Sequence, residues 1–129
     1  MRVERERGEP GLAVSFSHHR DDSRMVRHVV RPWIRAGGSL ADDVTLAASE
    51  LVANVVEHTD DGGRVRLWDQ DPLLLEVDDH EHGLPRLREH PDESGGRGLA
   101  IVGRLAESWG VRVTPSGKTV WATFRRPPA

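Results

Sequence analysis

Apolar and polar positions along the chain follow two different periods. A two-residue alternation runs through 12–17, 64–68, 73–77, 109–114 and 118–125, and it predicts five β-strands. Apolar residues spaced three and four apart predict three helices: the first from Asp21 to Ile34, the second from Ser39 to about His58 and the third from Leu99 to Ala106. This order predicts an α+β fold, with three main helices on one face of a mixed, mainly antiparallel sheet.

The helix boundaries follow from capping and breaking residues. Pro32 lacks an amide hydrogen, so we expect a kink or a fresh start near it. Gly37 and Gly38 should then stop the first helix. Ser39 is the expected cap of the second helix, with Asp42 three residues on in the capping-box position.

Composition narrows the class of protein. The chain has 129 residues, which fits one domain over 11–126 after a flexible N-terminal tail at 1–10. A formal net charge of −3 gives no reason to expect direct nucleic-acid binding. Cysteine is absent, which excludes disulfides and cysteine nucleophiles. No stretch reaches membrane-spanning length, so we expect a cytoplasmic protein without a membrane partner.

The second predicted helix carries a polar row beside its apolar stripe. Glu50, Asn54 and Glu57 are spaced four and three apart, which puts them on neighbouring positions of one helix face. Such a row is often a solvated face. The alternative is a site in which Asn54 offers a hard oxygen to Mg²⁺ and Glu50 orients or deprotonates an attacking hydroxyl.

Asp79 lies two residues beyond the strand predicted at 73–77, in line with the apolar residues of that strand. Leu73, Leu75 and Val77 share one face, and the two-residue period puts Asp79 on that face as well. An Asp before a Gly- and Pro-containing loop is commonly a turn or cap residue. It can also accept a hydrogen bond from the exocyclic amine of a purine in an apolar pocket.

Glycines come directly before the third predicted helix. Gly95, Gly96 and Gly98 with Arg97 let backbone amides approach an anion at a helix N-terminus, although such glycines are more often an ordinary loop. No Gly-Lys-Ser/Thr sequence follows, so this is not a Walker loop.

Together these segments resemble a known set of boxes. Glu50-Leu-Val-Ala-Asn54, then Val77-Asp-Asp79 with Gly83-Leu-Pro85, then Gly96-Arg-Gly-Leu99 are similar to the three nucleotide-binding boxes of the Bergerat-fold (GHKL) ATPases. This is the superfamily of gyrase, histidine kinases and MutL. The resemblance covers roughly residues 12–125, and it is best to the stand-alone branch of anti-sigma-factor serine/threonine kinases. It implies a two-layer α/β sandwich of the histidine-kinase-like ATPase type.

The resemblance also implies roles for single residues. Asn54 would be the Mg²⁺ ligand, Glu50 the general base and Asp79 the carboxylate that recognises adenine. The remaining nucleotide-side residues would be Glu57 on the polar row, His58 near the phosphates, Gly83 at the adenine pocket, and Gly96, Arg97, Gly98 and Leu99 at the phosphate-side end of the lid. In the final hairpin, Thr119 or Lys118 would face the nucleotide; we assign Thr119 to the nucleotide-binding set, and leave open which of the two reaches the ligand.

The function implied by the resemblance is that of an ATP-binding anti-sigma factor. It would transfer phosphate from Mg-ATP to a Ser or Thr of an anti-sigma factor antagonist and bind a sigma factor, with homodimer formation left open. Glu81 stands where the family's first box glycine is usual, and the segment between Arg86 and Ser94 would be a short lid. Two alternatives share this fold: a non-catalytic ATP sensor and a module that binds only protein.

Overall fold

The computed structural model describes residues 2–5, 11–17, 19–58, 61–80 and 96–126. Six strands form one sheet in the order β1-β2-β3-β4-β6-β5, and every pairing between the described strands is antiparallel. The strands are β1 (Arg2–Arg5), β2 (Gly11–Phe16), β3 (Gly63–Trp68), β4 (Leu73–Asp79), β5 (Ser108–Thr114) and β6 (Gly117–Phe124). The expected antiparallel character is therefore confirmed, without the parallel pairing that a mixed sheet would have.

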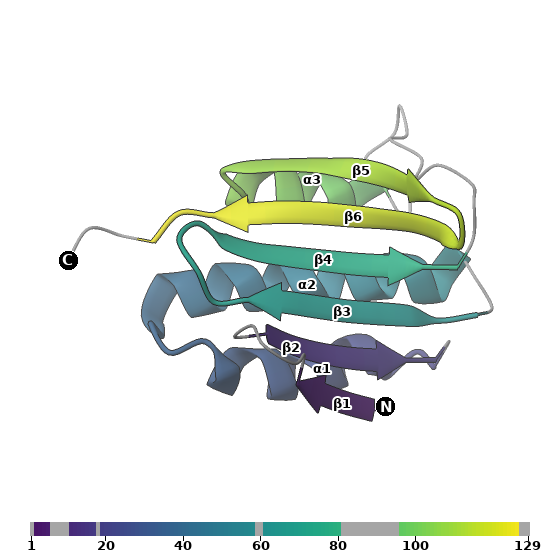
Figure 1. The fold of residues 1–129 in the computed structure, drawn as a ribbon, viewed down its shortest axis with the longest axis horizontal. Helices are drawn as coiled ribbons and strands as arrows, with labels where there is room; N and C mark the ends of the chain where they lie inside the picture. The colour runs from purple at the N-terminus through teal and green to yellow at the C-terminus, as the bar shows by residue number, and fades with distance from the viewer. Residues whose placement is uncertain (1, 6–10, 18, 59–60, 81–95, 127–129) are drawn as a thin grey trace.

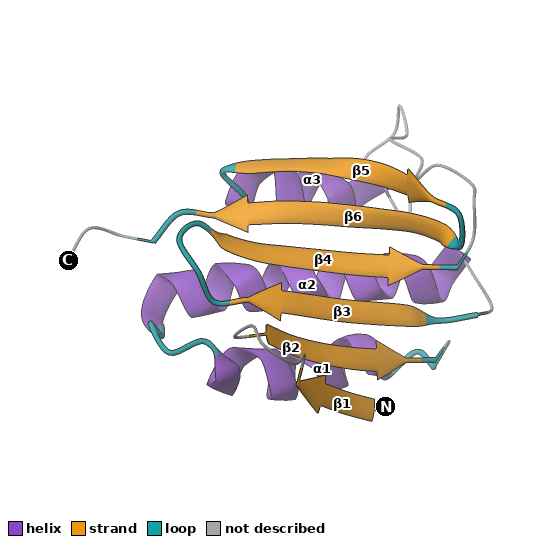
Figure 2. Ribbon diagram, viewed as in Figure 1, coloured by secondary structure: helices purple, strands orange, loops and turns teal. Residues whose placement is uncertain are grey.

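The helices described are α1 (Asp22–Trp33), α2 (Gly38–His58) and α3 (Gly96–Leu105). They lie together behind the sheet and leave its other face uncovered (Figure 2). This confirms the predicted two-layer α+β sandwich. Among the described helices, none has both the length and the apolar character needed to cross a membrane.

The core lies between the helices and the covered face of the sheet. Alternate residues of the strands point into it, which is why β3 shows a strict buried and half-buried alternation. The α2 helix supplies much of the opposing surface, with Val44, Ala48, Leu51, Val52 and Val55 all buried. The pattern of apolar residues at helical spacing thus predicted the buried side of α2 correctly.

The strand β1 was not predicted. Arg2–Arg5 lies inside the segment 1–10 that the sequence predicts as a flexible tail, but it pairs with β2 from Ser15 to Leu12. Val3 is the one apolar residue of this strand, so its hydrophobic pattern is too short to show a period. Backbone pairing with the neighbouring strand β2 accounts for its presence.

Three expectations about α1 and α2 are wrong. The α1 helix runs through Pro32 without a break, because the proline lies in its last turn, and the helix ends at Trp33 before it reaches the glycines. Gly37 and Gly38 both have a positive φ and form the connection, and α2 begins at Gly38. Ser39 is therefore not the cap.

Asp42 does not complete a capping box. Its carboxylate instead accepts a hydrogen bond of 2.6 Å from Arg31 of α1. This contact joins two packed helices across the exposed side of the molecule, and an ion pair of this exposure contributes little to stability.

Several segments that are distant in the sequence meet at one end of the molecule. The C-terminal end of α2, the C-terminal end of β4 and the start of β6 lie at the same side (Figure 1). The α3 helix packs against α2, and it begins on this side because β5 returns from the opposite end. The fold therefore gathers the polar row, Asp79 and the glycines that open α3.

Candidate functional site

The polar row of α2 lies at the side of the molecule where these elements meet, with Glu50 next to the start of α3. Glu50 and Asn54 are half-buried, while Glu57 and His58 are exposed in the last turn. The Oδ1 atom of Asn54 is buried and has no hydrogen-bond partner among the described residues. An unsatisfied buried amide oxygen is costly, and a bound cation is one way to satisfy it.

The glycine box of α3 contacts this row. A Cβ atom added to Gly98 would lie 3.5 Å from Oε2 of Glu50 and 3.4 Å from its carbonyl oxygen. The first turn of α3 therefore lies so close to α2 that a Cβ atom on Gly98 would be in ordinary van der Waals contact with Glu50. The structure thus brings together the acid of the first box and the glycine of the third.

The donor set fits Mg²⁺ in the form that the resemblance implies. Asn54 Oδ1 is a hard oxygen without a hydrogen-bond partner in the described part of the chain, and Mg²⁺ is usually held by one or two protein oxygens with water and phosphate completing the octahedron. Within the described ranges, no cluster of three or more His, Cys, Asp or Glu residues has the arrangement of a metal site. A single amide ligand next to a nucleotide phosphate needs no such cluster.

Asp79 lies on the helix-facing side of the sheet, as the two-residue period predicts. It is 6% exposed and follows the buried Val77 with the same parity. Lys118 is opposite it in the register of β4 and β6, and Lys118 Nζ lies 3.0 Å from Asp79 Oδ2. The side chains of this ion pair are only 11% and 5% exposed.

Lys118 and Thr119 lie on opposite faces of the sheet. Lys118 points to the helix-facing side with Asp79, whereas Thr119 points to the uncovered face and donates a hydrogen bond of 2.6 Å to Asp78 Oδ1. Successive residues of a strand point to opposite faces, so only one of the two can lie beside Asp79. Lys118 is that residue, and the assignment of Thr119 to the nucleotide-binding set stays a prediction.

Other members of the predicted site are placed in part. Gly96 is the first residue of α3. Leu99 is 1% exposed and packs in the core, so its side chain is structural and only its backbone can face a ligand. Gly83, Glu81 and the expected lid lie outside the described residues, and for Arg97 only the backbone position in α3 is described.

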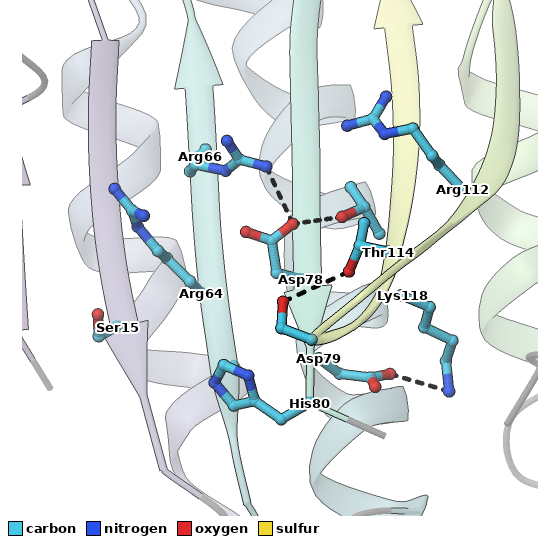
Figure 3. Close-up of a pocket in the computed structure, with 12 residues that line it drawn as sticks. Ser15, Arg64, Arg66, Asp78, Asp79, His80, Arg112, Thr114 and Lys118 are labelled. Carbon is cyan, nitrogen blue, oxygen red and sulfur yellow. Dashed lines mark hydrogen bonds and ion pairs between the residues drawn. The ribbon is translucent and has the colours of Figure 1, made fainter. Parts of the chain in front are cut away.

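A second polar cluster lies on the uncovered face of the sheet. It borders a cavity of about 460 Å³, whose lining includes Arg64, Arg66, Asp78, Arg112, Thr114 and Thr119. Arg66 donates a hydrogen bond of 3.0 Å to Asp78, which also accepts the hydroxyl of Thr119 (Figure 3).

Glu76 lies at the centre of this cluster, between two arginines. It is 5% exposed although it is on the uncovered face, because Arg66 and Arg112 both pair with its carboxylate. Arg66 also lies over the ring of Trp68, 5.4 Å from its centroid. Charges that are paired in this way are typical of a structural network, and the sequence pattern alone did not predict it. The sequence indicated only that Glu76 alternates with Leu75 and Val77 and therefore points to the other face of the sheet.

Comparisons with known proteins find a matching family and a similar solved structure. The family model of the histidine kinase-like ATPase domain matches residues 16–124. A crystal structure of the RsbU and RsbW domains of Rv1364c from Mycobacterium tuberculosis is similar to 92% of this chain, with a TM-score of 0.68 and 25% sequence identity. This chain covers 33% of that solved chain. No curated protein matches.

The matched range contains the elements that the fold brings together at one end of the molecule. It begins at the last residue of β2 and ends at the last residue of β6, so it includes α2, β4 and α3 together with the sheet that orients them. The chain therefore belongs to the family of histidine kinase-like ATPase domains.

Proposed function

We propose that this protein is an ATP-binding anti-sigma factor with serine/threonine kinase activity toward an anti-sigma factor antagonist. The observation that carries the proposal is the contact between Gly98 and Glu50, which joins the box on α2 to the glycines that open α3. Family membership over 16–124 supports nucleotide binding at this place.

The nucleotide would lie between α2, the end of β4 and the start of α3. Asp79 would accept a hydrogen bond from the exocyclic amine of adenine, since its carboxylate is nearly buried on this side of the sheet. The backbone amides at Gly96 and Gly98 would face the phosphates at the N-terminus of α3, where the helix dipole favours negative charge. Asn54 Oδ1 would hold Mg²⁺, which neutralises charge on the phosphates when it is bound.

Glu50 would act as the general base. The hydroxyl oxygen of a partner's Ser or Thr attacks the γ-phosphorus, Glu50 accepts the hydroxyl proton, and ADP leaves with the electrons of the broken P–O bond. Glu50 is half-buried beside Gly98, so it is held next to the phosphate end while its carboxylate stays accessible. Positioning and charge neutralisation would supply most of the rate enhancement.

The partners follow from the branch that the boxes resemble. The likeness to a solved chain that contains an RsbW domain supports this branch. A sigma factor and a small antagonist protein would compete for the domain, and phosphorylation of the antagonist would shift the competition toward the sigma factor.

The proposal is tested by phosphate transfer. The protein is incubated with Mg²⁺, γ-³²P-labelled ATP and a candidate antagonist encoded beside its gene. We expect labelling of the antagonist by the wild type and by the control Asp42→Asn, which changes an exposed carboxylate on the same helix. We expect loss of labelling with Glu50→Gln, by roughly a hundredfold or more in rate, because a general base contributes about that much.

The other outcomes distinguish the alternatives. ATP binding without transfer to any antagonist would support an ATP sensor and overturn the kinase. Absence of ATP binding at millimolar concentration would overturn both and leave a module that binds protein alone.

A further inference from the structure

The ion pair between Lys118 and Asp79 is a feature that the proposed roles do not use. The two residues are register partners on β4 and β6, and their charged atoms are 3.0 Å apart. The neighbours with the same parity, Val77 and Val120, are 2% and 6% exposed. A cation therefore sits next to the adenine-recognising carboxylate, on the apolar side of the sheet.

The pair is expected to stay intact when a ligand binds. Separating the two groups would leave an ammonium group with little access to water and without its carboxylate, which is strongly unfavourable. The ion pair alone does not exhaust either group, because a carboxylate has about four acceptor positions and an ammonium group has three donors. Asp79 and Lys118 can therefore hold each other and still present one acceptor and one charged donor side by side.

This acceptor and donor match one edge of adenine. The 6-amino group of adenine is a donor, and the adjacent N1 atom is an acceptor. Guanine has the reverse order on this edge, with an acceptor at O6 and a donor at N1. We propose that Lys118 is a specificity-determining residue, which donates a hydrogen bond to N1 of adenine while Asp79 accepts one from the 6-amino group.

This inference rests on the proposed nucleotide site and adds a residue to it. Thr119 cannot supply the same donor, since its hydroxyl points to the opposite face and donates to Asp78. Lys118 is the register partner of Asp79 on β6, so it is the side chain of that strand that can donate a hydrogen bond to a base bound at Asp79. A charge-assisted hydrogen bond in a nearly buried site is stronger than a neutral one, so it should contribute measurably to base selection.

The test uses atomic changes in the base. Binding of ATP, 1-deaza-ATP and GTP is measured by calorimetry with the wild type, Lys118→Met and the control Arg31→Met, which removes an exposed cation outside the site. In 1-deaza-ATP a C–H group replaces N1 and the 6-amino group is kept. We expect the wild type and Arg31→Met to bind 1-deaza-ATP roughly tenfold more weakly than ATP, because one charged hydrogen bond is lost. We also expect GTP to bind more weakly than ATP.

Lys118→Met should bind ATP more weakly and discriminate little between ATP and 1-deaza-ATP. Equal binding of the two by the wild type would overturn the role of Lys118, and this comparison needs no variant to fold. Undiminished ATP binding by Lys118→Met, or equal binding of GTP and ATP by the wild type, would overturn it too. Failure of the wild type to bind ATP at all would instead overturn the proposed function, and the inference with it.

Discussion

Gly98 of α3 lies against Glu50 of α2, so closely that a Cβ atom on the glycine would be 3.5 Å from the carboxylate oxygen Oε2. This is an ordinary van der Waals distance for a single methyl group, whereas a branched side chain would place two further atoms beyond the Cβ position. The contact fixes the start of α3 relative to the acid. It therefore couples the phosphate end of the proposed site to its general base.

Substitutions at Gly98 should affect the stability of the fold and the rate of phosphate transfer differently. Gly98→Ala should fold at least as stably as the wild type, because alanine gains up to about 1 kcal/mol over glycine in a helix and its methyl group fits. Gly98→Val should push Glu50 away and lower phosphate transfer more than ATP affinity. Thermal melting, calorimetry and the transfer assay measure the three quantities. Equal transfer rates for the alanine and valine variants would contradict this reading.

The Asp79–Lys118 pair should contribute strongly to stability. Asp79→Asn and Lys118→Met each break a nearly buried ion pair, and each should cost about 3 kcal/mol in the free energy of unfolding. The double variant should cost clearly less than the sum of the single costs, because no uncompensated charge remains. Urea denaturation measures these values.

An exposed ion pair provides the control for this cycle. Arg125 pairs with Glu107 at 2.6 Å, with side chains that are 78% and 36% exposed. Arg125→Ala should therefore cost less than about 1 kcal/mol. Additive costs for Asp79→Asn and Lys118→Met would show that the two side chains do not act as a pair.

Gly117 should be intolerant of a side chain for a local reason. It opens β6, and a Cβ atom there would lie 2.0 Å from the carbonyl oxygen of Asp79. Gly117→Ala must shift β4 against β6, so we expect a loss of stability together with weaker ATP binding.

Gly37→Ala is the matched control for Gly117→Ala. Gly37 has a φ of 60°, but a Cβ atom there would meet nothing within 4 Å. It should cost only the strain of a left-handed backbone, about 1 kcal/mol, and leave ATP binding unchanged. Weaker ATP binding by Gly37→Ala, or unchanged binding by Gly117→Ala, would contradict the local explanation.

The charged network on the uncovered face should affect stability but not nucleotide binding. Glu76→Ala leaves Arg66 and Arg112 without their shared carboxylate, so we expect a cost of about 3 kcal/mol in unfolding free energy. The ATP affinity of the folded variant should match the wild type, because Glu76 points away from the helices. A large loss of affinity in a folded Glu76→Ala protein would place the ligand on the uncovered face instead.

The sequence predicted the direction of side chains best where it depends only on the two-residue period of a strand or the 3.6-residue period of a helix. The inward direction of Asp79 followed from strand parity, and the buried stripe of α2 followed from helical spacing, since both depend only on neighbouring residues. Parity also favoured Lys118 over Thr119. Thr119 was nevertheless assigned to the nucleotide-binding set, and the structure places Lys118, not Thr119, beside Asp79.

Features that depend on distant contacts were missed. The start of α2 is set by the backbone at Gly37 and Gly38, so the capping pattern at Ser39 had no effect. The strand β1 exists through pairing with β2, which four mostly charged residues do not reveal in isolation. Likewise, the burial of Glu76 requires arginines from two other strands.

The most direct test of the proposed site is the Mg²⁺ dependence of ATP binding. Calorimetric titrations with and without Mg²⁺ compare the wild type with Asn54→Leu, which removes the buried oxygen Oδ1 at similar volume, and with the control Asp42→Asn, which changes an exposed carboxylate on the same helix. We predict that Mg²⁺ strengthens ATP binding by the wild type and by the control but not by Asn54→Leu. Binding by Asn54→Leu that responds to Mg²⁺ as the wild type does, or no ATP binding by the wild type, would contradict the account.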